Sequence, residues 1–245
     1  MKQLMNKYII SLFLLVCGNF ALHAQHTAVT SVLSKCMEYY SSHPELAFEM
    51  NYKMYSSYSS SKLIHQLNGK FQSSGGKTLV QMGGQVQLLN DMYAVLTDEA
   101  TKTIVVQERN KEVDSKRTPL GIDSLIGLFA ETKVMKESAG IVTLSFNKPK
   151  AAFHTVNNFT VDIDQATGKV LAAVLYYAFD LNEFYDEYDT KTIPRIEIFY
   201  ENYVEDQVGN SDLFSESRFF KINNQKLEPV QGYNDYRLID LRIKK

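Results

Sequence analysis

The clearest pattern in the chain is an alternation of apolar and polar positions between residues 46 and 55. Apolar side chains occupy every second position of this stretch: Leu46, Phe48, Met50, Tyr52 and Met54. Successive side chains of a strand point to opposite faces, so the stretch predicts a strand with one apolar face. Lys62 to Ser73 forms a second strand-like run after the serine-rich residues 56–61. We therefore expect the two runs to form a hairpin.

Short strand-like runs separated by turn residues continue to residue 108. The pairs Gly75-Gly76 and Gly83-Gly84 are among the turns, and the last run is Thr103–Glu108. Met92–Leu96 is apolar at both alternating sets of positions, so each face of that strand needs cover. Further strands are expected at Ile141–Phe146, Phe153–Ile163, Lys169–Phe179 and Ile193–Val204, with a tight turn at Asp164–Gly168.

Helical patterns are few. Residues 27–41 have apolar side chains at helical spacing, and Cys36 lies on that apolar side, where we expect it to be buried as a small hydrophobic residue. A second, shorter helix is indicated by Ile122, Leu125, Ile126 and Phe129. The tail from about residue 205 is expected to add one or two edge strands, including the alternating run Tyr236–Ile243.

Together these elements predict a mainly β fold of about eleven antiparallel strands with a few short helices. Strands that are apolar on both faces need cover on each side, and two short helices can plug only part of the inside, so the sheet must curl on itself. A strongly curved sheet that is incompletely filled contains an apolar pocket.

The first residues have the pattern of a secretory signal. Lys2 and Lys7 precede the apolar run Tyr8 to Cys17. Ala21-Leu22-His23-Ala24 follows, with small residues suited to a cleavage site. We expect residues 1–24 to be a signal peptide cleaved near Ala24/Gln25, and residues 25–245 to form a single periplasmic domain. Cleavage would leave Cys36 without an intramolecular disulfide partner.

Charge and motifs indicate no catalytic chemistry. The formal net charge is -2, and acidic and basic residues are mixed, so no nucleic-acid partner is expected. Histidines are scattered without metal-ligand spacing, and no nucleophile and base can be paired, so we expect no catalytic residue, metal or cofactor. The acidic, aromatic stretch Asp180–Asp189 is a solvated loop or, alternatively, a patch for a partner.

Several segments together resemble the outer-membrane lipoprotein carrier superfamily, the LolA/LolB-like proteins. They are "FEMNYKMY", "IHQLNGKFQ", "MYAVLTDEATKTIVV", "FTVDIDQATGKVLAAVLYY" and "IPRIEIFYENY", and the resemblance covers most of residues 27–204. The resemblance implies an unclosed antiparallel barrel, a lid of helices across its mouth, and an apolar cavity for acyl chains.

The expected function is that of a non-enzymatic, exported, monomeric carrier of acylated cargo, a lipid or a lipoprotein, with a membrane-associated protein as a further partner. The candidate cavity residues are Phe48, Met50, Tyr52, Phe71, Val80, Met82, Met92 and Leu96 on the strands, with Phe129 from the lid. Each of these side chains could instead fill a core, because alternation marks burial and not ligand contact. The alternative function is a periplasmic protein-interaction or sensor module with the same fold and no lipid transport.

Overall fold

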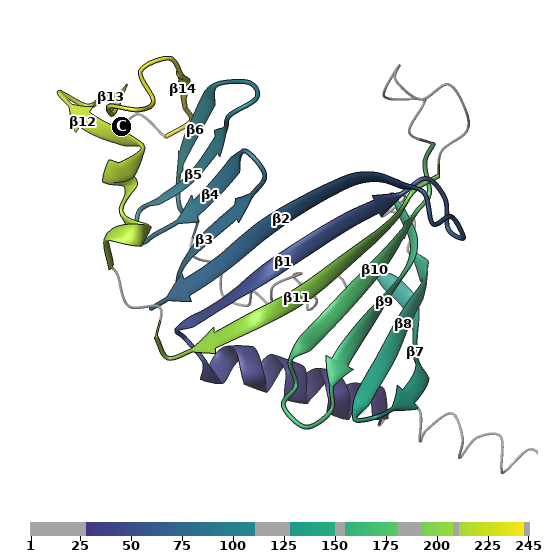
Figure 1. The fold of residues 1–245 in the computed structure, drawn as a ribbon. Helices are drawn as coiled ribbons and strands as arrows, with labels where there is room; N and C mark the ends of the chain where they lie inside the picture. Colours follow the sequence, from purple (N-terminus) through teal and green to yellow (C-terminus); the bar gives the residue numbers. More distant parts are fainter. Residues whose placement is uncertain (1–27, 111–127, 150–154, 181–192, 208–210, 243–245) are drawn as a thin grey trace, which may run out of the picture.

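Strands dominate the computed structural model, which describes residues 28–110, 128–149, 155–180, 193–207 and 211–242 (Figure 1). The chain enters through a helix, residues 28–42, that agrees with the predicted amphipathic helix. The strands that follow are β1 (Leu46–Tyr55), β2 (Leu63–Ser74), β3 (Lys77–Met82), β4 (Gln85–Leu89), β5 (Tyr93–Asp98), β6 (Thr103–Glu108), β7 (Phe129–Ser138), β8 (Ile141–Pro149), β9 (Val156–Asp164), β10 (Val170–Tyr177), β11 (Arg195–Glu205), β12 (Phe220–Asn223), β13 (Lys226–Pro229) and β14 (Arg237–Asp240).

Twelve of the described strands form one sheet in the order β14-β6-β5-β4-β3-β2-β1-β11-β10-β9-β8-β7. Two meanders, β1–β6 and β7–β11, meet where β11 pairs antiparallel with β1. Every neighbouring pair is antiparallel except β14 and β6, which run parallel. The two ends of the sheet, β14 and β7, do not pair with each other. The predicted unclosed antiparallel sheet is confirmed.

The helix covers one face of the sheet, which we call the helix-side face (Figure 1). Val29, Cys36 and Tyr39 belong to a buried cluster with Phe48 of β1 and Phe146 of β8. Burial of a continuous apolar surface is the main favourable contribution to folding, and this cluster joins strands from both meanders. Cys36 is buried within it, as its place on the apolar side of the helix predicts. No helix in the described part of the chain is long and apolar enough to span a bilayer.

The opposite face of β3–β6, which we call the tail-side face, is covered by the C-terminal tail. The tail contains two short 3-10 helices, η2 (Ser211–Phe214) and η3 (Glu216–Arg218), and then β12 and β13. Phe214, Phe219 and Phe220 pack with Leu79, Leu88, Tyr93, Val95, Ile104 and Val106 in a second buried cluster. One face of the two-faced Met92–Leu96 run is therefore closed by residues far away in the sequence.

The tail is only partly an edge strand, contrary to expectation. β14 does pair with β6 at one end of the sheet. β12 and β13 instead form a separate two-stranded sheet. The adjacent Phe219 and Phe220 are both buried, because the tail is enclosed between its own turns and the main sheet. An alternating edge strand could not bury two consecutive rings in this way.

Phe129, which was expected to lie in a short second helix, lies in a strand instead. Phe129 begins β7, a strand absent from the predicted set, which pairs antiparallel with β8. Most side chains of β7 are exposed, so polar residues occupy both faces and the alternation that signals a strand is weak. The described chain has fourteen strands instead of about eleven. Ile122, Leu125, Ile126, the signal region and residues 181–189 lie outside the described part.

The predicted turn after β9 places Gly168 directly against the helix. Gly168 has a φ of +84°, and an added Cβ would lie 2.6 Å from the carbonyl oxygen of Lys35. The turn is held by Asp164, whose carboxylate accepts from the backbone N–H of Thr167 at 2.7 Å. That hydrogen bond lowers the pKa of Asp164. Lys35 Nζ also donates to the carbonyl oxygen of Gln165 at 2.7 Å.

Replacing Gly168 with alanine is expected to reduce the free energy of unfolding by about 2–5 kcal/mol. The left-handed backbone costs an L-residue about 1–2 kcal/mol, and the collision with the helix backbone adds strain of about 1–3 kcal/mol. Gly140→Ala is the matched control, because Gly140 has a φ of +79° with no atom within 4 Å of the added Cβ. Urea denaturation should show the larger loss for Gly168→Ala, and equal losses would contradict a docked helix.

Candidate functional site

A recess lies on the helix-side face, where the helix ends against β2, β3 and β4. It has a volume of about 220 Å³. Its lining is Tyr40, His43, Pro44, Leu46, Phe71, Ser73, Gly76, Lys77, Thr78, Leu89 and Arg109. We call it the apolar recess because Leu46, Phe71, Leu89 and the Tyr40 ring make up much of the wall. The end of the helix at residue 42 leaves this corner of the face uncovered.

Stacked aromatic rings fix the wall of the apolar recess. Phe71 on β2 lies opposite Phe48 on β1, and the two rings stack with their centroids 4.6 Å apart. Phe48 also contacts the rings of Tyr200 and Tyr203 on β11. Phe71 itself is only half-buried. One side of this ring pair therefore belongs to the core, whereas Phe71 faces the recess.

Arg109 closes one side of the apolar recess. Its guanidinium donates to the carbonyl oxygens of Asn90 at 2.8 Å and Gly76 at 2.9 Å, so it joins the β2–β3 and β4–β5 turns. Lys77 lies beside it in the lining and forms an ion pair with Asp91 at 3.3 Å. The recess thus has an apolar wall and two cationic side chains at its rim. Sequence patterns do not reveal Arg109, because its partners are far from it in the chain.

An apolar strip continues from the recess along the same face of the sheet. The register pairs Thr78 with Leu89 and Leu89 with Ala94, and the next layer of the same face contains Val80, Leu96 and Val105, with the exposed Gln87 between Val80 and Leu96. Leu96 is 43% exposed and Met92, just before β5, is 60% exposed. Tyr93, Val95 and Thr97 on the tail-side face of the same strand are buried. Among the described residues, the tail covers the tail-side face, whereas on the helix-side face Leu89 is buried and Leu96 is left exposed.

The structure divides the nine candidate cavity residues into three groups. Phe48, Met50 and Phe129 are buried in the helix-side cluster, with Phe129 packed edge-on against Phe159. Phe71, Val80 and Met82 are partly buried against that cluster. Leu96 is exposed on the helix-side face of β5, Met92 is exposed before β5 in a recess that it lines with the tail, and Tyr52 is half-buried. Only Phe71 lines the apolar recess directly, so a ligand-binding role for the set stays a prediction.

A network of tyrosines fastens the helix beside the recess. Tyr40 and Tyr203 share a hydrogen bond of 2.9 Å between their hydroxyls, and Tyr203 donates to the carbonyl oxygen of Val170 at 2.6 Å. Tyr39 donates to Glu205 at 2.8 Å, and Lys169 forms an ion pair with the same carboxylate at 2.7 Å. Burial raises the pKa of Tyr39, Tyr40 and Tyr203. The hydrogen bonds from Lys169 and Tyr39 lower the pKa of Glu205.

Replacing Glu205 with glutamine is expected to remove an acid-sensitive part of the stability. Because folding lowers the pKa of Glu205 below its ordinary value of 4.5, its contribution is present above that value and is lost as pH falls through the folded value. Glu205→Gln should therefore unfold at lower urea than the wild type at neutral pH, and the difference should shrink at pH about 3. Glu201→Gln, on the same strand but exposed, is the control. If the difference in stability between Glu205→Gln and the wild type were the same at pH about 3 as at neutral pH, this role of Glu205 would be contradicted.

The described residues contain no group of three or more histidine, cysteine, aspartate or glutamate side chains that could hold a metal ion.

Neither a protein-family model nor a curated protein matches the chain. Among solved structures, it is similar to an uncharacterized conserved protein from Thermus thermophilus, with a TM-score of 0.46, 6% identity, and coverage of 87% of this chain and 99% of the other. It is also similar to a LolA superfamily protein from Nitrosomonas europaea, with a TM-score of 0.35, 12% identity, and coverage of 77% and 97%.

A further similar structure is the MucA/MucB complex of Pseudomonas aeruginosa. The TM-score is 0.40 and the identity is 12%, with coverage of 82% of this chain and 62% of the matched chain. The present chain therefore spans less than two thirds of that matched chain.

Proposed function

We propose that the protein is an exported, non-enzymatic carrier that binds the acyl chain of a lipid or lipoprotein on the helix-side face. The observation that carries the proposal is the contrast between the two faces of β3–β6. The tail closes one face, while Leu96 on the other face is 43% exposed. Three phenylalanines of the tail bury one face of these strands, and burial of the apolar side chains on the other face by a ligand would also be favourable in free energy.

The dimensions of the site favour a flexible chain that extends beyond the recess. A volume of about 220 Å³ is smaller than the ~300–1,000 Å³ of pockets that enclose a whole small-molecule ligand. The recess therefore suits one end of a ligand, and the strip of Val80, Ala94, Leu96 and Val105, which the polar Gln87 interrupts, would hold the rest. An acyl chain has the length and apolar surface for this path.

The rim of the recess favours a ligand with negative charge. Arg109 and Lys77 lie in the lining, and a guanidinium is well suited to a carboxylate or a phosphate. Such a head group would remain near the turns while the chain follows the strip. The signal-peptide pattern of residues 1–24 adds the periplasmic location to this proposal.

Two measurements test the proposal. Native mass spectrometry of the protein purified from its own envelope should show a bound lipid mass, and dansyl-undecanoic acid should gain fluorescence in the purified protein. A stoichiometric protein partner without lipid, together with no uptake of the dansyl probe, would favour the interaction module. Only Asp180 of the Asp180–Asp189 segment lies in the described chain, so the part of this segment in that alternative stays a prediction.

A further inference from the structure

The long strand β2 is paired along only half of one edge. It pairs with β1 from end to end, Leu63 to Ser73. It pairs with β3 only from Gly69 to Ser74, because the chain turns into β4 after Met82. The last bond on that side joins the N–H of Gly83 to the carbonyl oxygen of Asn68. Residues 63–68 therefore have no strand partner on this side among the described residues, and we call them the free edge.

The free edge lacks the charged and proline residues that keep many strand edges from pairing, although its pairing with β1 shifts register between Leu63 and His65. Natural edges are protected by lysine or other charges, proline, bulges or shortness. The terminal strand β7 has Lys133, Lys136 and a register shift, and the terminal strand β14 has only four residues. The free edge reads Leu-Ile-His-Gln-Leu-Asn, with no lysine, arginine, carboxylate or proline. Leu63 in it is 43% exposed.

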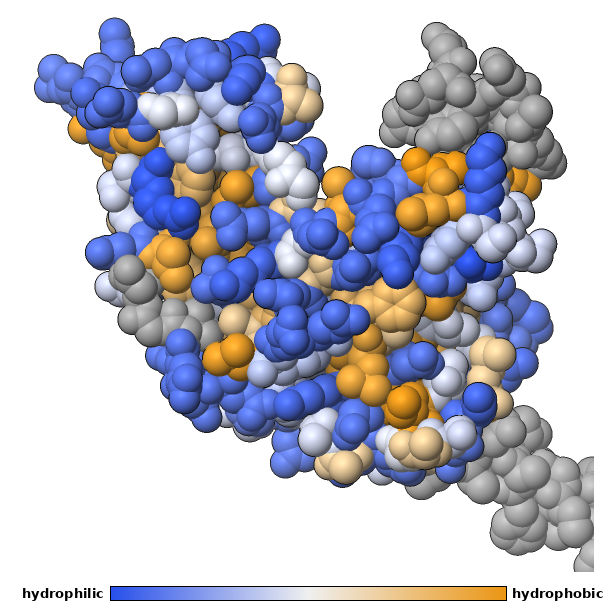
Figure 2. Space-filling model, viewed as in Figure 1, coloured by the Kyte–Doolittle hydropathy of each residue, from blue (hydrophilic) through white to orange (hydrophobic). Residues whose placement is uncertain are grey.

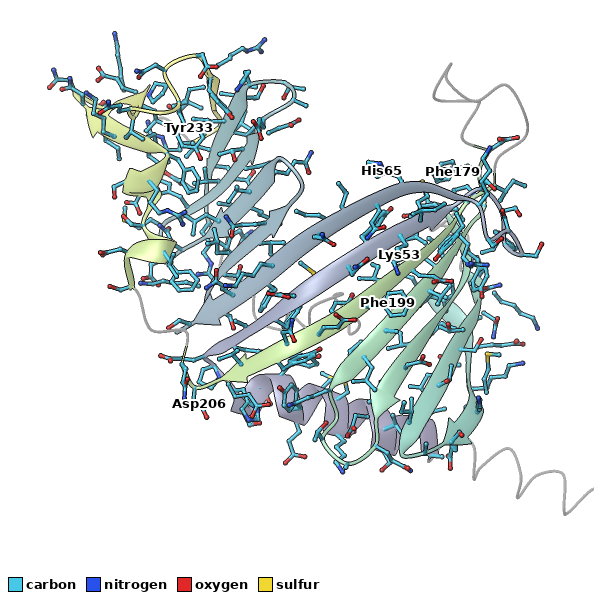
Figure 3. All side chains as sticks on the ribbon, in the orientation of Figure 1. Lys53, His65, Phe179, Phe199, Asp206 and Tyr233 are labelled. Carbon is cyan, nitrogen blue, oxygen red and sulfur yellow. The ribbon has the colours of Figure 1, made fainter. Side chains whose placement is uncertain are left out.

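A polar cleft adjoins the free edge at the point where β3 leaves β2. Its volume is about 620 Å³, and Glu49, Asn51, Asn68, Lys70, Gln81 and Glu201 are among its lining residues. Figure 2 shows an open notch in the surface beside the lobe of β4–β6, and Figure 3 places His65 on its β2 side. The cleft and the free edge are continuous through Asn68.

The cleft offers hydrogen-bond acceptors and excess negative charge. The Oδ1 atom of Asn51 is buried and accepts no hydrogen bond from the described residues. Glu49 and Glu201 face a single lysine, Lys70, in the lining. That atom is closed off from solvent, so a ligand in the cleft would meet the exposed carboxylates of Glu49 and Glu201 instead. A basic side chain supplies the opposite charge and the N–H donors that carboxylates accept.

We infer that the free edge is a docking site for an extended segment of a partner protein, which adds a strand to β2 and places a lysine or arginine in the cleft. Strand addition uses main-chain hydrogen bonds for affinity and side-chain pockets for selectivity. Since the bond to Gly83 directs the backbone of Asn68 to the open side, the alternation of a strand directs that of Gln66 there as well. This site is separate from the apolar recess.

Peptide binding tests the inference. The probes are a fluorescein-labelled hexapeptide of alternating valine and lysine, the same peptide with glutamate for lysine, and the first peptide with N-methylated amides. Fluorescence anisotropy should show binding of the basic peptide, weaker binding of the acidic one and none of the methylated one. NMR hydrogen exchange should show protection of the Gln66 amide only with the basic peptide bound.

Gln66→Pro is the decisive variant, because proline removes the outward N–H and is tolerated at strand edges. We expect it to weaken binding of the basic peptide about tenfold or more, as loss of a main-chain hydrogen bond and of edge geometry implies. Gln66→Lys, which adds an edge lysine, is the second variant if the proline impairs folding. Glu201→Gln should weaken the basic peptide and leave the acidic one unchanged.

Uptake of dansyl-undecanoic acid should be the same in these variants as in the wild type, which separates this site from the proposed carrier function. Equal binding of the basic peptide to the wild type, Gln66→Pro and Gln66→Lys would overturn the inference. Binding of chitohexaose in the cleft without binding of the peptide would overturn it too and point to a carbohydrate. An absence of peptide binding up to about 1 mM has the same consequence.

Discussion

Truncating Phe219 to alanine is expected to lower the free energy of unfolding by about 3–5 kcal/mol, although the residue lies in the C-terminal tail. Phe219 is 1% exposed and belongs to the cluster that covers β3–β6. Its ring lies 5.6 Å from that of Tyr233, which Figure 3 shows in the tail near β14. Removal of the ring would leave a cavity between tail and sheet that neither side can readily fill.

The measurement is urea denaturation followed by circular dichroism. Ile222→Ala in β12 is the matched control, since Ile222 is 49% exposed and its truncation should cost less than about 0.5 kcal/mol. A loss below about 1 kcal/mol for Phe219→Ala would mean that the tail is a detachable appendage. The tail-side face of the sheet would then be as open as the helix-side face, and the contrast that supports the carrier proposal would disappear.

Asn90 shows why the tail belongs to the structure of the sheet. Its side-chain oxygen accepts from the backbone N–H groups of Met92 and Tyr93 at 3.0 and 2.9 Å. Its amide nitrogen donates to Glu216 at 2.6 Å and to the carbonyl oxygen of Phe214 at 3.3 Å. One buried side chain thus sets the β4–β5 turn and holds the tail. On the other side of the turn, Arg109 binds the Asn90 carbonyl oxygen.

Local periodicity predicts the strands whose two faces have different surroundings. β1 spans the predicted alternating stretch, and β6 has the predicted bounds Thr103–Glu108. β7 escapes prediction because it is an edge strand with mostly exposed side chains. The pairing of β11 with β1 and of β14 with β6 depends on contacts between distant segments, which no window of sequence contains. Sequence therefore predicts the curved sheet better than the order of its strands.

For the candidate site, too, local periodicity predicts one part, and contacts between distant segments determine the rest. Alternation correctly places Phe48, Phe71, Val80 and Leu96 on one face, as the register confirms. It cannot say that the helix packs on Phe48 and ends before it reaches Leu96, because that depends on how the helix lies on the sheet. Arg109 has no periodic pattern around it, and its role follows only from the turns that it joins. Which part of the face is core and which is open is therefore a property of the assembled fold.

The second large effect is expected on binding of an acyl chain. Leu96→Gln should weaken dansyl-undecanoic acid about tenfold, because glutamine keeps the length of the side chain, adds no charge and removes apolar contact worth roughly 1–2 kcal/mol. Thr78→Phe should weaken it at least as much, because the ring would occupy the apolar recess that Thr78 lines. Fluorescence titration gives the affinities, and urea denaturation should show that Leu96→Gln unfolds within about 0.5 kcal/mol of the wild type.

The matched control is Leu63→Gln, because Leu63 and Leu96 are both leucines in strands and both are 43% exposed. They differ in position: Leu96 lies on the apolar strip, and Leu63 lies on the far half of β2, away from the recess. If exposed apolar surface alone bound the probe, both variants would lose affinity equally, and the carrier proposal would fail. A loss confined to Leu96→Gln and Thr78→Phe would place the acyl chain on the strip and in the recess, because only these two substitutions change that path.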